Sequence, residues 1–368
     1  MIQLKDLCQK ASSNIAQKDL EGHEGQYPIY GASGLIGYVD FYKQENPYVA
    51  VVKDGAGIGR VMCLPEKSSV IGTMQYILPN EGVNVHYLAF AMEHMNLAKY
   101  FSGATIPHIY FKDYGKEKLL ERTEKEQKSI AEILNKMDSL ISLRKQQIAK
   151  LDELVKARFV EMFGDLVAPQ CEYPELKLVD ICADADDIKC GPFGTQLNKD
   201  EYKAKGVAIW EIPQINSGFS EMPTHFITEE KAAILNAYSI EPGDIAMSRK
   251  GNVGKCGLFP ENLKKGIIHS DVLRIRVDKR KVDSCFMMYQ LHFSEAVKRQ
   301  IGMVSSGAIM AGINVTKLKQ IKVRIPELEN QRMFAAFVER VDQQKQTVQQ
   351  SLEKLELMKK ALMQEYFG

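Results

Sequence analysis

The sequence has almost no net charge, because 48 lysine and arginine residues face 47 aspartate and glutamate residues, for a formal charge of +1. Binding to nucleic acid must therefore come from local patches rather than from a bulk field. Apolar residues make up 45% of the 368 and charged residues 26%, which is typical of folded globular proteins and not of disordered ones. A chain of this length is expected to form two or more domains.

Signatures of secretion and of membrane insertion are also missing. The seven cysteines are scattered, and no pair has CxxC spacing, which argues against zinc ribbons and a disulfide framework and favours reduced thiols. The N-terminus carries Lys5 and Asp6, unlike a signal peptide, and no apolar run is long enough to span a bilayer. We therefore expect a cytoplasmic protein without a membrane partner.

Motifs of catalysis are equally scarce. The sequence contains no HExxH, its seven histidines are dispersed, and it lacks a convincing Asp…Glu-x-Lys set of nuclease carboxylates. The glycine-containing stretch GPFGTQLNKD (191–200) lacks the Gly-Lys-Ser/Thr ending of a P-loop. We expect neither catalytic residues nor a metal site on this chain.

What the sequence does contain is a long internal repeat. Shifted by 204 residues, segment 127–164 lies on segment 331–368 without a gap, and the copies end in FVEMFG and MQEYFG. Both segments are free of glycine and proline before that last glycine and rich in helix-forming residues. About 38 helical residues span roughly 57 Å, more than a compact domain needs. We predict two long helices that pair with each other; the alternative is that each packs only on its own globular domain.

The apolar residues of both segments follow a heptad pattern. Its a and d positions are occupied in the first copy by Ile130, Leu134, Met137, Ile141, Ile148, Leu151, Val155 and Met162, and in the second by Phe334, Val338, Val341, Val348, Leu352, Leu355, Leu362 and Tyr366. Each seam is interrupted twice by a basic residue where the other copy is apolar: Arg144 and Arg158 in the first, Lys345 and Lys359 in the second.

The repeat predicts four parts: a first head (1–118), a first long helix (119–164), a second head (165–326) and a second long helix (327–368). Both heads contain short strand-like runs broken by glycine, so we expect an α+β protein with two mixed α/β heads. The heads are far less alike than the helices, which suggests that each recognises something different. A repeated helix presents one surface twice and should bind two copies of one partner around a pseudo-two-fold axis.

Each head has a glycine turn after a strand, VVKDGAGIGRVMCL (51–64) and DIAMSRKGNVGKCGLF (244–259), with Arg60 or Lys255 directly after the last glycine. The first could also be the S-adenosylmethionine loop of a methyltransferase, but a strand-like run follows it where such a loop needs a helix.

Between Ile245 and Lys281 the second head has ten basic and three acidic residues, which form either a DNA-binding surface or an ordinary solvated face. Polar and basic side chains that suit base edges and phosphates are the candidate DNA contacts: Tyr30, Ser33, Lys53, Arg60, Gln75, Thr105 and His108 in the first head, and Thr195, Gln196, Asn198, Lys199, Gln214, Asn216, Ser248, Arg249, Lys250, Asn252 and Lys255 in the second.

With these parts in order, the chain resembles the DNA-specificity subunit of type I restriction-modification systems over essentially its whole length. The matching phrases are YPIYGASGLIGYVDFY (27–42), GPFGTQLNKDEY (191–202), SRKGNVGK (248–255), and ENQR (329–332) with its echo KEQK (125–128). One departure is Asp54, which stands in the first glycine turn where a basic residue would be expected.

The resemblance implies a subunit without catalytic activity whose heads each read one half of a split site in double-stranded DNA. It implies that the helices form an antiparallel coiled coil that sets the gap between the half-sites. It also implies that the chain recruits two copies of an adenine methyltransferase subunit and, further, translocase-endonuclease subunits. S-adenosylmethionine, ATP and Mg would then be held by those partners and not by this chain. A stand-alone DNA-binding or scaffold protein, and a self-contained methyltransferase, remain the alternatives.

Overall fold

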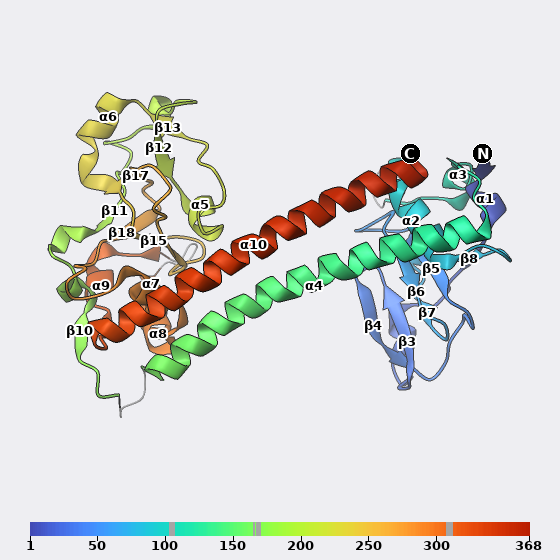
Figure 1. Cartoon of the computed structure of the whole chain (residues 1–368), viewed down its shortest axis with the longest axis horizontal. Helices are drawn as coiled ribbons and strands as arrows, with labels where there is room; N and C mark the ends of the chain where they lie inside the picture. Colours follow the sequence, from blue (N-terminus) through green and yellow to red (C-terminus); the bar gives the residue numbers. More distant parts are fainter. Residues whose placement is uncertain (103–106, 165, 167–170, 307–311) are drawn as a thin grey trace. The chain divides into compact units, whose positions relative to one another are not determined.

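The structure is a computed structural model that describes residues 1–102, 107–164, 166, 171–306 and 312–368. The chain divides into two compact units, Met1–Ile148 with Thr347–Gly368, and Ala149–Gln346. Each unit holds one head together with part of both long helices (Figure 1). The candidate contact Thr105 lies outside the described residues.

The first head is built on an antiparallel sheet in the order β2-β8-β5-β6. Its strands are β2 (Cys8–Ser12), β5 (Tyr48–Val52), β6 (Val61–Leu64) and β8 (Met74–Pro79). All five residues of β5 are buried, which explains the uninterrupted apolar run YVAVV. A smaller sheet has the order β4-β3-β7, in which β3 (Tyr27–Gly31) pairs antiparallel with β4 (Gly34–Val39) and parallel with β7 (Ser69–Val70).

The second head repeats this topology with different side chains. Its antiparallel sheet has the order β11-β18-β15-β16, formed by β11 (Ile188–Cys190), β15 (Ile245–Ser248), β16 (Cys256–Leu258) and β18 (Val272–Ile275). Its smaller sheet, β13-β12-β17-β14, again contains one parallel pair, between β12 (Val207–Trp210) and β17 (Gly266–Ile268). The duplication seen in the long segments therefore extends to the heads, where the sequences have diverged but the strand pairing has not.

Short elements at the base of each head also correspond. A two-stranded ribbon joins β1 (Ile2–Gln3) to β9 (Lys118–Leu119) in the first head and β10 (Glu175–Lys177) to β21 (Lys322–Arg324) in the second. A single helical turn follows, α1 (Leu4–Leu7) or η3 (Leu178–Ile181). In both, a cysteine thiol donates to the first carbonyl of that turn, Cys8 to Leu4 at 3.3 Å and Cys182 to Leu178 at 3.5 Å.

The second head is longer because two connections carry extra helices. Between β12 and β13 (Phe226–Ile227) lies α5 (Ile212–Asn216), where the first head has only the tight turn between β3 and β4. Between β13 and β15 lie α6 (Glu229–Ile234), η6 (Asn236–Tyr238) and β14 (Ser239–Ile240). These insertions have no counterpart among the described elements of the first head.

In each unit a helix covers the main sheet, and its N-cap is held by a glutamine of a long helix. The covering helices are α2 (Val85–His94) and α7 (Ser284–Phe293). Their N-caps, Asn84 and Asp283, accept hydrogen bonds from the next turn, as N-cap side chains commonly do. The backbone N–H of Asn84 donates to Gln127 at 3.0 Å, and that of Asp283 donates to Gln331 at 2.9 Å. The two glutamines are aligned by the 204-residue repeat.

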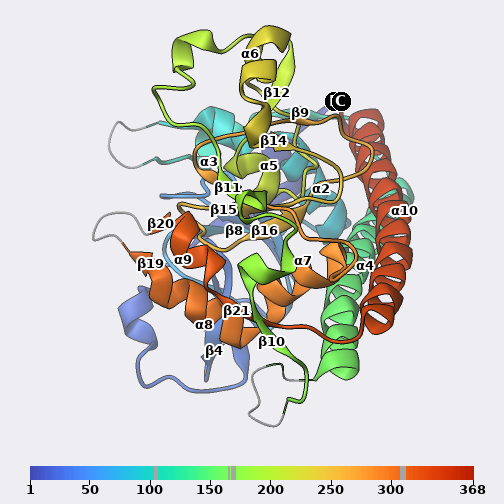
Figure 2. The ribbon, with the colours of Figure 1, turned by 90° about the vertical axis from the view of Figure 1, so that its left-hand side faces the viewer.

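The two predicted long helices are α4 (Glu124–Phe163) and α10 (Leu328–Phe367), each of 40 residues. Every residue assigned to an a or d position is buried or partly buried. In the first unit Asp138 pairs with Lys359 at 2.8 Å and Lys145 with Glu356 at 2.9 Å. A later residue of α4 thus contacts an earlier residue of α10, which means that the two helices run in opposite directions. In the second unit Lys345 pairs with Asp152 at 2.6 Å. Within each unit the segments therefore lie side by side and antiparallel (Figures 1 and 2).

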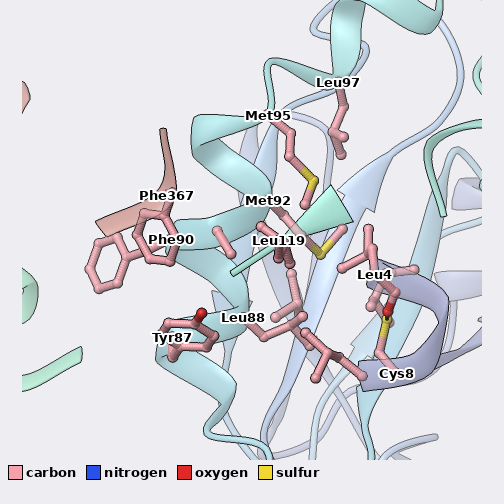
Figure 3. Packing of buried hydrophobic residues seen from close by; sticks show 14 of the residues in the cluster. Leu4, Cys8, Tyr87, Leu88, Phe90, Met92, Met95, Leu97, Leu119 and Phe367 are labelled. Carbon is pink, nitrogen blue, oxygen red and sulfur yellow. Dashed lines mark hydrogen bonds between the residues drawn. The ribbon is translucent and has the colours of Figure 1, made fainter. Parts of the chain in front are cut away.

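The two repeated endings pack against the covering helices. The ring of Phe367 lies 5.3 Å from that of Tyr87 on α2, in a cluster with Phe90, Met92 and Leu4 (Figure 3). The ring of Phe163 lies 4.8 Å from that of Phe286 on α7. The end of each long helix thus completes the core of one head, and the helices both pair and pack on globular domains.

Two further properties concern the environment of the protein. Across the described ranges, no helix combines the length and the apolar character needed to cross a bilayer. All seven cysteines lie in these ranges and are free thiols, three of them buried.

Candidate DNA interface

The two glycine turns occupy the same place in the two main sheets. The first connects β5 to β6 and the second connects β15 to β16. Gly55, Gly57 and Gly59 have φ of 80°, 87° and 80°, and Gly251 and Gly254 have φ of 67° and 85°, values that favour glycine. Gly59 is also crowded, because a Cβ there would lie 2.5 Å from the backbone nitrogen of Ala98. The turns therefore depend on glycine for both conformation and space.

The same backbone hydrogen bonds anchor both turns. Lys53 N–H donates to the Thr73 carbonyl at 3.0 Å, and Arg249 N–H donates to the Asp271 carbonyl at 2.9 Å. The carbonyls of Lys53 and Arg249 accept from the N–H groups of Ile109 and Ile313, both at 3.1 Å. Lys53 and Arg249 are therefore equivalent positions, and so are the following residues.

Each turn also pairs with a segment beside it through an isolated β-bridge. Asp54 bridges to His108 in the first head, and Lys250 bridges to Gly312 in the second. His108 and Gly312 are again 204 residues apart. The turn and its neighbouring segment thus form one composite surface, which we call the turn surface: residues 53–60 with 107–110 in the first head, and 249–255 with 312–314 in the second.

The turn surface of the first head contains a compact set of charged groups. The Asp54 carboxylate contacts both the Lys53 ammonium and the His108 imidazole. Burial, and then the Lys53 charge, lower the pKa of His108, and burial lowers the pKa of Lys53. Asp54, which stands where the resemblance led us to expect a basic residue, therefore balances the charge of Lys53.

Three more candidates of the first head lie around this surface. Arg60 is exposed, and its Nη1 donates to the Ala32 carbonyl at 2.7 Å. Ser33 is exposed in the turn between β3 and β4. Tyr30 is half-buried, and burial followed by the influence of Tyr38 raises its pKa. The bond from Arg60 to Ala32 brings the glycine turn next to the β3–β4 turn.

Three predicted contacts are internal and do not reach the surface. Gln75 is 5% exposed and accepts a hydrogen bond from the Tyr114 hydroxyl at 2.7 Å. Gln214 is 3% exposed and donates to the Met222 carbonyl at 3.2 Å. Ser248 is fully buried. The two glutamine amides are hydrogen-bonded inside the heads, and the buried Ser248 hydroxyl has no hydrogen-bond partner among the described residues. None of the three side chains therefore lies on a surface that DNA could reach.

The remaining candidates of the second head fall into two groups. Thr195, Gln196, Asn198 and Lys199 are exposed on the loop after β11, and Asn252 is exposed at the tip of the glycine turn. Asn216, Arg249, Lys250 and Lys255 are half-buried. Lys255 donates to the Asn216 carbonyl at 2.9 Å, and Lys250 pairs with Asp271 at 2.8 Å. The second group therefore already has partners within the head.

Part of the positive charge of segment 245–281 is paired or buried inside the head. Arg276 forms two bonds of 2.7 Å with Asp244, which lies one residue outside that segment. Arg274 is 4% exposed and donates only to backbone carbonyls, while hydrogen bonds from Arg280 lower the pKa of Asp278 to about 2. Arg274 and Arg276 are therefore taken up in contacts within the head, whereas the segment as a whole keeps its excess of basic residues. Within the described chain, the exposed Lys264 and Lys265 have no ion-pair partner.

Two features of the geometry bear on an enzyme function. The first glycine turn leads into strand β6 (Val61–Leu64), whereas the cofactor loop of a methyltransferase would lead into a helix. A cavity of about 1060 Å³ lies in the second head, between β12, α6 and the loop before β17. None of the predicted site residues lines this cavity. The candidate residues belong to exposed turns instead, as expected for contacts with a large ligand.

Comparison with known proteins agrees with this arrangement. A family model described as the type I restriction modification DNA specificity domain matches residues 1–153 and 187–357, one match for each head and its helix. The chain belongs to the type I restriction-modification DNA specificity family. It is a specificity subunit with two such domains.

Two relatives from Methanocaldococcus jannaschii are similar over nearly the whole chain. The type I restriction enzyme MjaVIII specificity subunit is 24% identical, covering 98% of this chain and 89% of the relative. The putative type I restriction enzyme MjaX specificity subunit is also 24% identical, covering 98% and 91%.

Solved structures share the fold. The S subunit of a type I restriction-modification system from M. genitalium has a TM-score of 0.65 at 17% identity, with 100% of this chain and 95% of that chain covered. A chain from work on complex assembly and conformational transition of the type I R-M system has a TM-score of 0.56 at 13% identity, with 99% and 96% covered.

Within these specificity domains, two exposed aromatic residues beside the glycine turns were not among the predicted contacts. Tyr110 is 47% exposed, belongs to the first turn surface, and has its ring centroid 4.2 Å from that of His108. Phe193 is 50% exposed and lies against Arg249. The sequence signal for Phe193 was the phrase GPFG, which places an aromatic residue between Pro192 and Gly194 in a loop.

Proposed function

We propose that each head reads one half of a bipartite site in double-stranded DNA, with residues 1–118 and 165–326 as the two target-recognition domains. The observation that carries this proposal is that the two main sheets have the same strand order, while the side chains at equivalent turn positions differ. Lys53, Asp54 and His108 in the first head correspond to Arg249, Lys250 and Gly312 in the second. Two heads that share a backbone framework but differ in the side chains of their turns suit a protein that binds two different DNA sequences in the same geometry.

The glycine turns suit DNA contact for a physical reason. Without side chains at their tips, the turns can bring backbone N–H groups close to phosphates, while flanking polar side chains reach base edges. Arg60, Ser33 and Asn252 are exposed at these places, as are Thr195, Gln196, Asn198 and Lys199 on the adjacent loop. We propose these residues as the DNA interface, together with the half-buried Tyr30, Lys53, His108, Asn216, Arg249, Lys250 and Lys255.

The long helices are proposed to act as the spacer. Segments 119–164 and 327–368 would form an antiparallel coiled coil about which the two heads are related by a pseudo-two-fold axis. The ion pairs within each unit support this, because they are all consistent with one antiparallel register. A stiff helix pair would hold the gap between the half-sites constant, while the heads set the bases.

Partner binding is proposed to use the outward faces of the same helices. Leu154 and Met358 are equivalent in the repeat and are 46% and 54% exposed, although apolar. Because the position occurs once on each long helix, it would bind two copies of an adenine methyltransferase subunit. The resulting complex would further bind translocase-endonuclease subunits. This chain would then be non-catalytic, and the partners would hold S-adenosylmethionine, ATP and Mg.

The decisive test is to reconstitute the chain with its methyltransferase subunit and map methylated adenines in DNA exposed to the complex. We expect two short half-sequences separated by a gap of fixed length and unspecified bases. The chain alone should methylate nothing. Methylation by the chain free of partners, or methylation at a single continuous sequence, would contradict the proposal.

The number of partner copies can be tested separately. Leu154→Glu and Met358→Glu should each reduce the methyltransferase copies per chain from two to one, and the double variant should bind none, as read from the mass of the complex by light scattering. The exposed Gln146→Glu on the same helix adds a charge without removing an apolar side chain and should leave two copies bound. Two copies on the double variant would place the docking surface elsewhere.

A further inference from the structure

Phe193 is an exposed aromatic side chain on a rigid backbone. It is 50% exposed, yet its carbonyl accepts hydrogen bonds from the N–H groups of Gln196 at 2.7 Å and Leu197 at 3.1 Å, and Leu197 is buried. On the other side of the loop, Gly191 N–H donates to the Val272 carbonyl of β18 at 3.2 Å. The ring is thus held at the surface by a loop that is tied to the main sheet at Gly191, closed by its own hydrogen bonds, and anchored in a core at Leu197.

The guanidinium of Arg249 lies over this ring, with its central carbon 5.2 Å from the ring centroid, within cation–π range. Its Nε donates to the Ile313 carbonyl at 3.2 Å and its Nη1 to the Ser270 carbonyl at 3.3 Å. One face is covered by Phe193 and two of the three nitrogens are occupied. Arg249 is therefore placed to support the aromatic ring and poorly placed to clamp a phosphate.

The equivalent position in the first head is different. Lys53 makes the same backbone hydrogen bonds as Arg249, but its side chain pairs with Asp54 and not with an aromatic ring. The arginine–phenylalanine pair is thus a property of the second head and not of the shared scaffold. Two heads that recognise different DNA sequences need different side chains at equivalent contact positions.

We infer that Phe193 makes an apolar contact with a base in the half-site of the second head, and that Arg249 is a positioning residue that acts through Phe193. This inference rests on the proposed function and names a specificity determinant within it. A flat apolar ring at a DNA surface can stack on an unstacked base, wedge into a base step or cover a thymine methyl group. A contact with a thymine methyl group and a wedge at a flexible base step depend on the sequence, whereas stacking accepts any base. None of these contacts displaces a counterion.

The salt dependence of DNA binding separates this role from a phosphate contact. The complex of the chain with its methyltransferase subunit would be titrated onto a fluorescent duplex carrying its mapped site, at several salt concentrations. Phe193→Ala should weaken binding about tenfold, as stacking contacts do, with an unchanged slope of log K against log salt. Loss of a direct phosphate contact would lower that slope by about one.

Arg249 is then tested through its dependence on Phe193. Arg249→Ala should also weaken binding with an unchanged slope, and it should cause no further loss in a Phe193→Ala background. Arg249→Lys keeps the charge but not the planar fork, so it should behave like Arg249→Ala. Full rescue by lysine, or a slope lowered by about one, would overturn the positioning role and make Arg249 a phosphate contact.

Controls separate this inference from the proposed function. Ile234→Ala removes another exposed apolar side chain of the second head, on α6, and should not change binding. Substitution of each base pair of the second half-site should show that Phe193→Ala loses discrimination at one position and keeps it at the others. Wild-type binding that is site-specific and unaffected by Phe193→Ala would overturn this inference alone. Wild-type binding without site preference would overturn the proposed function as well.

Discussion

Two buried glutamines show how closely the two halves of the chain correspond in detail. Gln127 and Gln331 are 5% and 0% exposed. Each accepts from the N-cap residue of the helix that covers the main sheet, and each donates to a carbonyl just before its own long helix, Arg122 at 3.1 Å and Pro326 at 2.6 Å. One amide thus joins a head to its long helix in both halves.

This pairing predicts a stability cost for either glutamine. Gln127→Ala or Gln331→Ala would leave a buried N–H and a buried carbonyl without partners, so we expect each to lower the free energy of unfolding by about 1–3 kcal/mol. Denaturant unfolding measures this. Gln146→Ala, on the exposed side of α4, is the matched control and should change the free energy of unfolding by less than about 0.5 kcal/mol. Equal effects at all three positions would mean that the buried bonds contribute nothing specific.

His108 gives a prediction about pH. Burial and the Lys53 charge lower its pKa, while the Asp54 carboxylate in contact with it acts in the opposite direction. We expect a pKa below the ordinary value of about 6.5, measured by NMR titration of the imidazole. As the pH falls through about 6.5, His108 takes up a proton in the unfolded chain before it does so in the folded chain. This residue should therefore lower the free energy of unfolding below about pH 6.5. A measured pKa above 6.5 would show that the Asp54 contact dominates.

At the scale of elements, the basic residues in the helix seams have specific partners. Lys359, which is aligned with Val155 of the other copy, has a side chain 18% exposed and contacts Asp138 at 2.8 Å and Glu93 at 3.5 Å. Lys345, aligned with Ile141, pairs with Asp152. The interruptions of the apolar pattern therefore differ between the two copies, and each of these two is matched by an acid on the facing helix. Such pairs favour one register over others.

A charge exchange tests this function of Lys359. Lys359→Glu would place three acidic groups together, and we expect it to lower the free energy of unfolding by about 1 kcal/mol. Adding Asp138→Lys should restore most of that loss, because the pair is then reversed. Lys354→Glu, an exposed change on the same helix, controls for net charge. If the reversal failed to restore stability, the pair would not help to set the register.

The elements also show what the sequence can and cannot predict. Both long helices were predictable because a heptad repeat can be recognised from the spacing of apolar residues along the sequence, without knowledge of tertiary contacts. The shared topology of the heads was not predictable. Strands pair through backbone groups that are the same in nearly every residue, so two diverged strands such as β5 and β15 do not show in their sequences that they pair in the same way. Gln75 and Gln214 were misplaced since an amide can satisfy its hydrogen bonds equally well in a core. The partner of Arg276 was not predictable either, because Asp244 stands just outside the basic segment and pairs with it only across the sheet.

At the scale of the whole molecule, the proposed spacer makes a quantitative prediction. Seven residues inserted into both helices, around Lys145–Leu151 and Gln349–Leu355, keep the seam in register and lengthen each helix by about 10 Å. That corresponds to about three base pairs and roughly a third of a turn of DNA. We expect methylation of the same two half-sequences with a longer gap, mapped by sequencing. Undiminished methylation at the original gap would refute the spacer function.

The division of the chain into one continuous and one discontinuous unit has a consequence for biosynthesis. Residues 149–346 form a unit without interruption, whereas the other unit needs residues 1–148 and 347–368 together. Met363 and Phe367 belong to the core that also contains Leu4 and Tyr87. On the ribosome, the part made first must therefore wait with an incomplete core until residues 363–367 have emerged, while the part made second can finish folding earlier. A chain whose translation stops short would keep the surface around Tyr87 uncovered, and this exposed apolar surface would mark it for chaperones and proteases.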